Sequence, residues 1–189
     1  MLKRGMMPNR RFIAGCILGL AIGWLVSSCG QKEAKQEASA EVPAQTAVQP
    51  SKVASGSLNF SLADVKGNTV SLADYEGKVV MIDFWATWCG PCRQAIPHLK
   101  ELYDQHREKG FEILAIAMDE NGEKVVPPFV AANQINYKVL LGTPDVEAKF
   151  GGLLGYPTTF LIDRNGEIVD KTLGYRPKEY FDEKLKPLL

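Results

Sequence analysis

Two cysteines at the predicted junction of a strand and a helix are the residues best placed to do chemistry. Cys89 and Cys92 enclose Gly90 and Pro91; they follow the apolar run 79–82 and open an amphipathic segment typical of a helix. Because the first amide groups of a helix lack intrahelical partners and its dipole is positive there, this position favours thiolate over thiol at Cys89. A second thiol one turn away can resolve a mixed disulfide, so the pair predicts thiol-disulfide exchange.

Two other interpretations of this pair stay open from the residues alone. A structural disulfide that closes so short a ring would stabilise the fold by roughly 2 kcal/mol, against about 3 kcal/mol for a loop of about 15 residues. A zinc site normally needs four nitrogen or sulfur ligands, and beyond residue 57 the sequence offers Cys89, Cys92, His98 and His106. Helical periodicity places His98 on the solvent-facing side, so we predict no metal and no cofactor other than the redox-active cysteine pair itself.

Two more residues are candidates for serving the dithiol. Asp83 interrupts the apolar run 79–85 six positions before Cys89, and burial there should raise the pKa of its carboxyl group. Such a group could accept or return the proton of Cys92; the alternative is an aspartate at a sheet edge or paired with a lysine. Pro157 stands before another apolar run, where a proline cannot complete a strand ladder and a cis peptide bond is one solution.

The elements that position these residues alternate between strands and helices. Residues 79–85 and 111–118 are apolar at nearly every position, as central strands covered on both faces are, and an amphipathic helix lies between them. This order is a βαβ unit, which predicts an α/β fold with a parallel pair of strands. An N-terminal hairpin precedes the unit, and further helices, strands and a second hairpin are predicted over residues 123–134, 137–141, 144–150, 158–173 and 177–188.

Three prolines bear on the ends of these helices. Pro127 and Pro128 should kink the helix over residues 123–134 or delay its start, because proline removes a backbone donor. Pro177 should lie in the first turn of the last helix, where that donor is not needed.

The composition and the charge of the chain indicate one globular domain that has no nucleic-acid partner. The chain has 189 residues, of which 46% are hydrophobic, and a formal net charge of zero. Residues 1–56 carry seven Lys and Arg against three Asp and Glu, which leaves 15 basic and 19 acidic residues from Ser57 onward. A mildly acidic domain repels a phosphate backbone, so nucleic-acid binding is excluded as a function class.

The first 29 residues have the layout of an export signal. Four basic residues precede an uncharged apolar run, 12–26, which as a helix would span about 22 Å, short of the roughly 30 Å core of a bilayer. Residues 26–29, VSSC, resemble a bacterial lipobox, which implies lipid attachment at Cys29; an uncleaved signal anchor is the alternative. Residues 30–56, rich in Ala, Gln, Ser and charge, predict a flexible tether, so the folded domain should span residues 57–189.

The motifs around both candidate regions resemble the thioredoxin superfamily, specifically its membrane-anchored TlpA/ResA-like branch. The resemblance is carried by VVMIDFWATWCGPCR at residues 79–93, by Pro97 in the following helix and by YPTTFLID at residues 156–163. It implies a thioredoxin fold, that is, a central mixed β-sheet flanked by helices, with an N-terminal β-hairpin and a central insertion over residues 123–152.

The resemblance also implies roles for individual residues. Cys89 would be the attacking thiol, Cys92 the resolving thiol, Asp83 the buried acid and Pro157 a cis-proline lying against the dithiol. The residues expected to surround the active site are Trp88, Gly90, Pro91, Tyr156 and Thr158.

At two positions this chain differs from the residue that is common in the TlpA/ResA-like branch, and the two residues between its cysteines match those of reducing enzymes. Many TlpA/ResA-like members carry Asn where this chain has Asp83, which suggests a reductant with general proton-transfer capacity. The subgroup devoted to cytochrome c maturation often carries Glu after the cis-proline, where this chain has Thr158. Gly90 and Pro91 between the cysteines resemble the reducing thioredoxins rather than the oxidases.

We therefore predict an extracytoplasmic, membrane-tethered thiol-disulfide oxidoreductase that reduces protein disulfides, in cytochrome c maturation or in thiol homeostasis of the envelope. Its predicted partners are protein disulfide substrates, a membrane electron donor that re-reduces the cysteine pair, and the membrane of a bacterial cell envelope through lipid on Cys29. A thiol peroxidase and a non-catalytic envelope metal chaperone are the alternatives.

Overall fold

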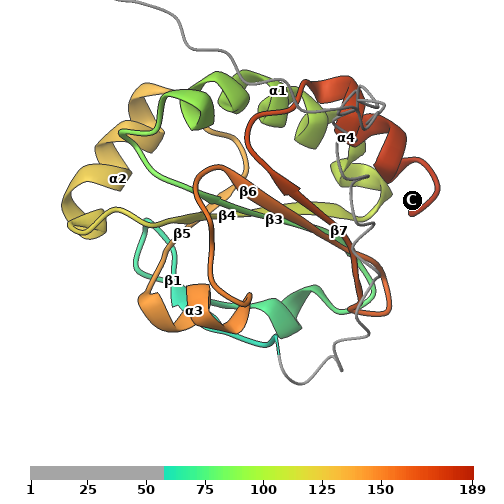
Figure 1. Cartoon of the computed structure of the whole chain (residues 1–189), viewed down its shortest axis with the longest axis horizontal. Helices are drawn as coiled ribbons and strands as arrows, with labels where there is room; N and C mark the ends of the chain where they lie inside the picture. Colours follow the sequence, from blue (N-terminus) through green and yellow to red (C-terminus); the bar gives the residue numbers. More distant parts are fainter. Residues whose placement is uncertain (1–57) are drawn as a thin grey trace, which may run out of the picture. The chain divides into compact units, whose positions relative to one another are not determined.

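A five-stranded sheet forms the centre of the domain, and other elements cover both of its faces (Figure 1). The computed structural model describes residues 58–189, so the predicted signal, Cys29 and the tether lie outside the described residues. The elements are, in chain order, β1 (Ser61–Ala63), β2 (Thr69–Ser71), η1 (Leu72–Tyr75), β3 (Val79–Trp85), α1 (Gly90–His106), η2 (Arg107–Lys109), β4 (Phe111–Ala117), α2 (Gly122–Ala132), β5 (Lys138–Leu141), α3 (Pro144–Lys149), β6 (Thr158–Ile162), β7 (Ile168–Leu173) and α4 (Lys178–Leu185).

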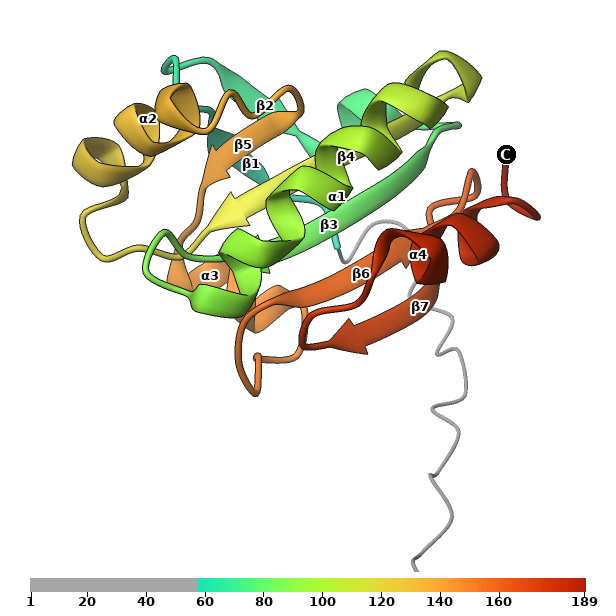
Figure 2. The same cartoon turned by 90° about the horizontal axis from the view of Figure 1, so that it is seen from above.

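The layers of the domain follow from the two faces of this sheet. Helices α1, α2 and α4 lie on one face, and the hairpin of β1 and β2 lies with α3 on the other (Figure 1). Figure 2 shows α1 lying over β3 and β4. No helix within residues 58–189 is long and apolar enough to span a bilayer.

The strand order of the sheet is β5-β4-β3-β6-β7, with β3 in the middle. Strand β3 runs parallel to β4, with Trp85 opposite Ala117, and antiparallel to β6, with Asp83 opposite Thr159. Strand β5 continues the parallel side and β7 the antiparallel side, so the sheet is mixed. The predicted thioredoxin fold is confirmed, together with its N-terminal hairpin, and the segment predicted as a central insertion forms α2, β5 and α3.

Strands β3 and β4 are buried along their whole length because both faces of the sheet are covered. Alternate residues of β3 enter two separate cores: Met81 and Trp85 pack in the core under α1, whereas Ile82 and Phe84 pack on the hairpin side. By this alternation Asp83 is directed to the face that α1 covers.

Helix α1 begins where the sequence predicts, directly after the first cysteine. Cys89 is its N-cap residue, and Gly90 and Pro91 are its first two residues. Proline is favoured there because its missing N–H would have no partner within the helix. After α1 and η2, Gly110 ends the helical segment in the left-handed conformation, at φ 83°.

A delayed helix start, one of the two effects predicted for Pro127 and Pro128, is not observed, and the last helix begins after Pro177. Helix α2 begins at Gly122, five residues before Pro127, so the prolines do not delay its start. The carbonyl oxygen of Asn121 accepts the first helical hydrogen bonds, and the complete burial of Val126 fixes the helix against the core. Pro177 is the N-cap residue of α4 and lies before its first turn rather than within it.

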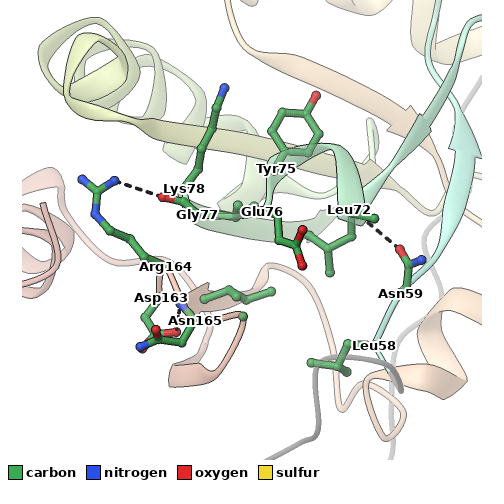
Figure 3. Close-up of a pocket in the computed structure, with 14 residues that line it drawn as sticks. Leu58, Asn59, Leu72, Tyr75, Glu76, Gly77, Lys78, Asp163, Arg164 and Asn165 are labelled. Atoms are coloured by element: carbon green, nitrogen blue, oxygen red, sulfur yellow. Dashed lines mark hydrogen bonds between the residues drawn. The ribbon is translucent and has the colours of Figure 1, made fainter.

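A groove of about 500 Å³ lies at the end of the sheet away from the dithiol (Figure 3). Its lining includes Lys78, just before β3, and Asp163, just after β6, whereas the dithiol follows the opposite end of β3. The guanidinium group of Arg164 donates a hydrogen bond to the carbonyl oxygen of Gly77 at 3.0 Å (Figure 3). It donates another to the carbonyl oxygen of Lys109, also at 3.0 Å. Arg164 thus ties together the segments that enter β3 and β4, and the groove is remote from the candidate chemistry.

Candidate active site

The dithiol lies between the end of β3 and the start of α1. Cys89 and Cys92 form a disulfide with a Cα–Cα distance of 5.2 Å. The N–H of Cys92 donates a hydrogen bond to the Sγ of Cys89 at 3.2 Å, so the N-cap sulfur receives one of the free amides of the helix. Cys89 keeps 5% of its surface exposed, and Cys92 is buried in the core under α1. This is a geometry in which the positive end of α1 acts on the first sulfur.

Asp83 is a buried acid on the α1 side of the central strand. Burial raises the pKa of its carboxyl group from 3.8 to about 7, and a 3.0 Å hydrogen bond from the hydroxyl of Thr159 opposes part of that rise. The sequence left two alternatives for Asp83, a place at a sheet edge or a pair with a lysine. Neither holds, because β3 is not at the sheet edge and Asp83 forms no ion pair among residues 58–189. A carboxyl group that titrates near neutral pH can take up and release a proton on the face where Cys92 is buried.

The segment before β6 reaches the same end of the sheet as the dithiol. Its Tyr156–Pro157 peptide bond is cis, as expected. Thr158 begins β6 opposite Phe84 and is buried, so it supports this segment from within instead of facing solvent. The carbonyl oxygen of Pro157 accepts a hydrogen bond from the N–H of Gly174 at 2.8 Å, which ties the segment to the end of β7.

Exposed apolar side chains mark the surface beside the dithiol. Trp88, which precedes Cys89, is 69% exposed, and its ring lies edge-on to that of Tyr156 with the ring centroids 6.1 Å apart. Leu154 lies two residues before Tyr156 and is 95% exposed. Sequence reasoning missed Leu154, although the pattern GGLLG at residues 151–155 breaks any continuous strand or helix face. A large exposed ring such as that of Trp88, directly before the attacking cysteine, is typical of a surface that contacts another molecule.

Asp119 is a second residue that sequence reasoning missed. It follows β4, and its carboxylate accepts hydrogen bonds from the N–H and the hydroxyl of Thr87, two residues before Cys89. The available signal was an acid directly after an apolar strand whose end lies beside the end of β3. Burial, and then the charges of Glu147 and Asp119, raise the pKa of Tyr156, so both carboxylates act on the aromatic surface.

The two histidines of the domain are engaged in other contacts. His98 is half-buried, and its Nδ1 lies 3.0 Å from the hydroxyl of Tyr175, so its predicted place on the solvent face is wrong. The chain between β7 and α4, which carries Tyr175, covers this side of α1. His106 is buried, with its Nε2 2.6 Å from a carboxylate oxygen of Asp182 in α4. In the part of the chain that the structure describes, no three His, Cys, Asp or Glu side chains are grouped so as to hold a metal ion.

Comparison with known proteins agrees with this geometry. Residues 54–171 match the AhpC/TSA family. The chain is 34% identical to the thiol-disulfide oxidoreductase ResA of Bacillus cereus, over 97% of this chain and 99% of that protein. A thiol:disulfide interchange protein of the thioredoxin family from Chlorobium tepidum superposes with a TM-score of 0.66 at 31% identity, over 76% of this chain and 99% of that one. The thioredoxin domain of a thiol-disulfide oxidoreductase from Bacteroides vulgatus gives a TM-score of 0.62 at 30% identity, over 69% and 94%. The chain therefore belongs to the AhpC/TSA family and is a ResA-like thiol-disulfide oxidoreductase with a thioredoxin fold.

Proposed function

We propose that this oxidoreductase reduces protein disulfides outside the bacterial cytoplasm while it is tethered to a membrane. The observation that carries the proposal is the combination of a dithiol at a helix N-terminus with a buried carboxyl group, Asp83, whose pKa lies near 7. Such a carboxyl group can supply and remove protons at neutral pH, where the free thiols must ionise to react. The resemblance of Gly90 and Pro91 to the reducing thioredoxins supports the direction of the reaction.

The proposed cycle begins with Cys89 as a thiolate. It attacks one sulfur of a client disulfide, forms a mixed disulfide and releases the other client sulfur as a thiolate. Cys92 then loses its proton to Asp83 and attacks the Sγ of Cys89, which forms the intramolecular disulfide and releases the second client sulfur. The client gains two electrons and two protons, and a membrane-bound dithiol donor returns two electrons and two protons to the cysteine pair.

The client would bind on the exposed surface beside Cys89. Trp88 and Tyr156 offer rings there, Pro157 would lie against the dithiol, and the exposed Leu154, two residues before Tyr156, would add to the apolar contact. Cytochrome c maturation and thiol homeostasis of the envelope are the two candidate pathways. The second is favoured because Thr158 stands where the cytochrome subgroup often has Glu.

The proposed location rests on the sequence of residues 1–56. A lipid on Cys29 and the tether over residues 30–56 would hold the domain near the membrane of the cell envelope. In the native host, labelled palmitate should enter the natural chain and Cys16→Ala, but not Cys29→Ala, and the mature chain should begin at residue 29. A mature chain that begins at Met1 would establish the uncleaved signal anchor instead, and label in Cys29→Ala would place the lipid on another residue.

The proposed function is tested by trapping clients in the native host. Cys92→Ala removes the resolving thiol, so mixed disulfides between Cys89 and envelope proteins should accumulate. They should be detected as covalent adducts that are cleaved by a reductant. The double variant with both cysteines replaced by Ala is the matched control and should trap nothing. If Cys92→Ala forms no adducts while Cys92→Ser rapidly consumes hydroperoxide, the chain is a thiol peroxidase and the proposal is wrong.

A further inference from the structure

The carboxylate of Asp119 holds the chain segment that leads from β3 to the dithiol. Its Oδ1 accepts a hydrogen bond from the hydroxyl of Thr87 at 2.6 Å, and the N–H of Thr87 lies 3.1 Å from Oδ2 and 3.3 Å from Oδ1. Hydrogen bonds to an ionised carboxylate are stronger than those between neutral groups. One side chain beyond the end of β4 thus binds both the backbone and the side chain of Thr87.

Thr87 is the second residue of the turn that ends at Cys89. The N–H of Cys89 donates a hydrogen bond to the carbonyl oxygen of Ala86 at 3.1 Å, which closes the turn. Just before the turn, the N–H of Met118 donates to the carbonyl oxygen of Trp85 at 2.8 Å. The chain that follows β4 therefore holds this turn at two nearby points.

We propose that Asp119 is a positioning residue for the attacking thiol. By holding Thr87, it fixes the turn that sets where the Sγ of Cys89 lies relative to the first N–H groups of α1. That sulfur accepts the N–H of Cys92 at 3.2 Å, and its preference for the thiolate depends on staying within reach of these amides. The inference rests on the proposed role of Cys89 as the attacking thiol, and it adds a residue that acts through Thr87.

The position and the charge of Asp119 act in opposite directions. Fixing the turn favours the Cys89 thiolate, whereas a nearby negative charge disfavours it. The negative charge of Asp119 acts on the surface beside the dithiol. The pKa of Tyr156 is raised by burial first, then by Glu147 and then by Asp119. Substitutions at Thr87 change the hydrogen bonds and leave the charge in place, so they separate the two effects.

Thr87→Val removes the hydroxyl donor and keeps the branched shape of the side chain, and Thr87→Ser restores the donor. The readout is the pH-dependent rate at which iodoacetamide alkylates Cys89 in the intact, reduced chain, followed by mass spectrometry of the Cys89 peptide. At pH 7 we expect a rate about 5- to 10-fold lower for Thr87→Val, with an upward shift of the titration midpoint, and a rate within about 2-fold of the natural chain for Thr87→Ser. The matched control is Glu120→Gln, which removes the exposed charge next to Asp119 and should leave the rate unchanged.

The proposal would be overturned if Thr87→Val left both the alkylation rate of Cys89 and its titration midpoint unchanged. It would also be overturned if the alkylation rate fell only because the variant is less stable, that is, with a lower Tm and an unchanged titration midpoint. A loss in Glu120→Gln as large as that in Thr87→Val would also overturn it, because the alkylation rate would then fall without any change in the hydrogen bonds between Asp119 and Thr87. If the natural chain fails to reduce protein disulfides while Thr87→Val still shifts the titration of Cys89, the proposed function fails and the positioning role of Asp119 stands.

Discussion

Replacement of Cys89 by Ser is expected to slow the reduction of protein disulfides by the intact chain at least about 1,000-fold. A hydroxyl group cannot form the mixed disulfide, so the first step of the cycle is lost. Cys92→Ser keeps the attacking sulfur and loses only the resolving step. Both cysteines are almost fully buried in the disulfide form, but Cys89 directly follows the exposed Trp88 and is the N-cap residue of α1, whereas Cys92 lies within the helix.

Both variants are tested on insulin disulfides. With dithiothreitol as the electron source, Cys89→Ser should show no rate above the background of dithiothreitol alone. Cys92→Ser, reduced beforehand and freed of dithiothreitol, should form about one mixed disulfide with insulin per chain and then stop. Serine is a favourable N-cap residue, so the Tm of Cys89→Ser should stay close to that of the reduced natural chain. Repeated turnover by Cys89→Ser would show that another group attacks the client.

Replacement of Asp83 by Asn is expected to have the second largest effect, a fall of about 100-fold in the rate of client reduction at pH 7. The amide keeps the size of the side chain and can still accept the hydrogen bond from Thr159, but it cannot take up the proton of Cys92. Because Asp83 titrates at about 7, the rate of the natural chain should rise with pH through this value, and the variant should lose that rise. The measurement is the pH profile of the rate from about pH 5 to 9.

The same substitution should stabilise the folded chain at high pH. The carboxyl group of Asp83 has a pKa of about 7 when folded and an ordinary value of 3.8. Below about pH 4 both states hold the proton; as the pH rises towards 7 the unfolded state ionises first, so stability falls by roughly 4 kcal/mol in total. Urea unfolding of the oxidised chain should therefore show Asp83→Asn to be roughly 2–4 kcal/mol more stable at pH 8 and nearly unchanged at pH 4.

The control for both effects is Glu112→Gln, which neutralises another buried acid in a central strand. Glu112 stands opposite Val80, at the end of β3 away from the dithiol. There its charge adds to the burial that raises the pKa values of Tyr75 and Tyr103. Its replacement should leave the pH profile of client reduction unchanged. The role assigned to Asp83 would be wrong if Asp83→Asn kept the natural rate and profile, or if Glu112→Gln changed them as strongly.

The parts of the fold that depend on residues close together in the sequence were predictable from the sequence. The continuous apolar runs of β3 and β4 predict strands buried on both faces, and both strands are buried throughout. Gly90 and Pro91 after a cysteine predict a helix start, and α1 begins there. The burial of Asp83 was also predictable, because a single acid within an apolar strand shares the environment of its neighbours.

The parts that depend on contacts between distant segments were not predictable from one sequence. Thr87 meets Asp119 only because β3 and β4 are adjacent and end together, and neither residue stands out in its own segment. His98 looks solvent-facing from the periodicity of α1, but the chain that carries Tyr175 returns over that side. The sequence pattern of one helix cannot show which later segment will cover it.

The reduction potential of the Cys89–Cys92 pair tests the central claim most directly, because it measures whether the site gives electrons to a client or takes them. The intact chain is equilibrated with buffers of oxidised and reduced dithiothreitol or glutathione, and the fraction of disulfide is read by thiol labelling and mass spectrometry. A reductase should have a potential of about −250 mV or lower. A potential near about −120 mV, that of a strong oxidant, would contradict the account.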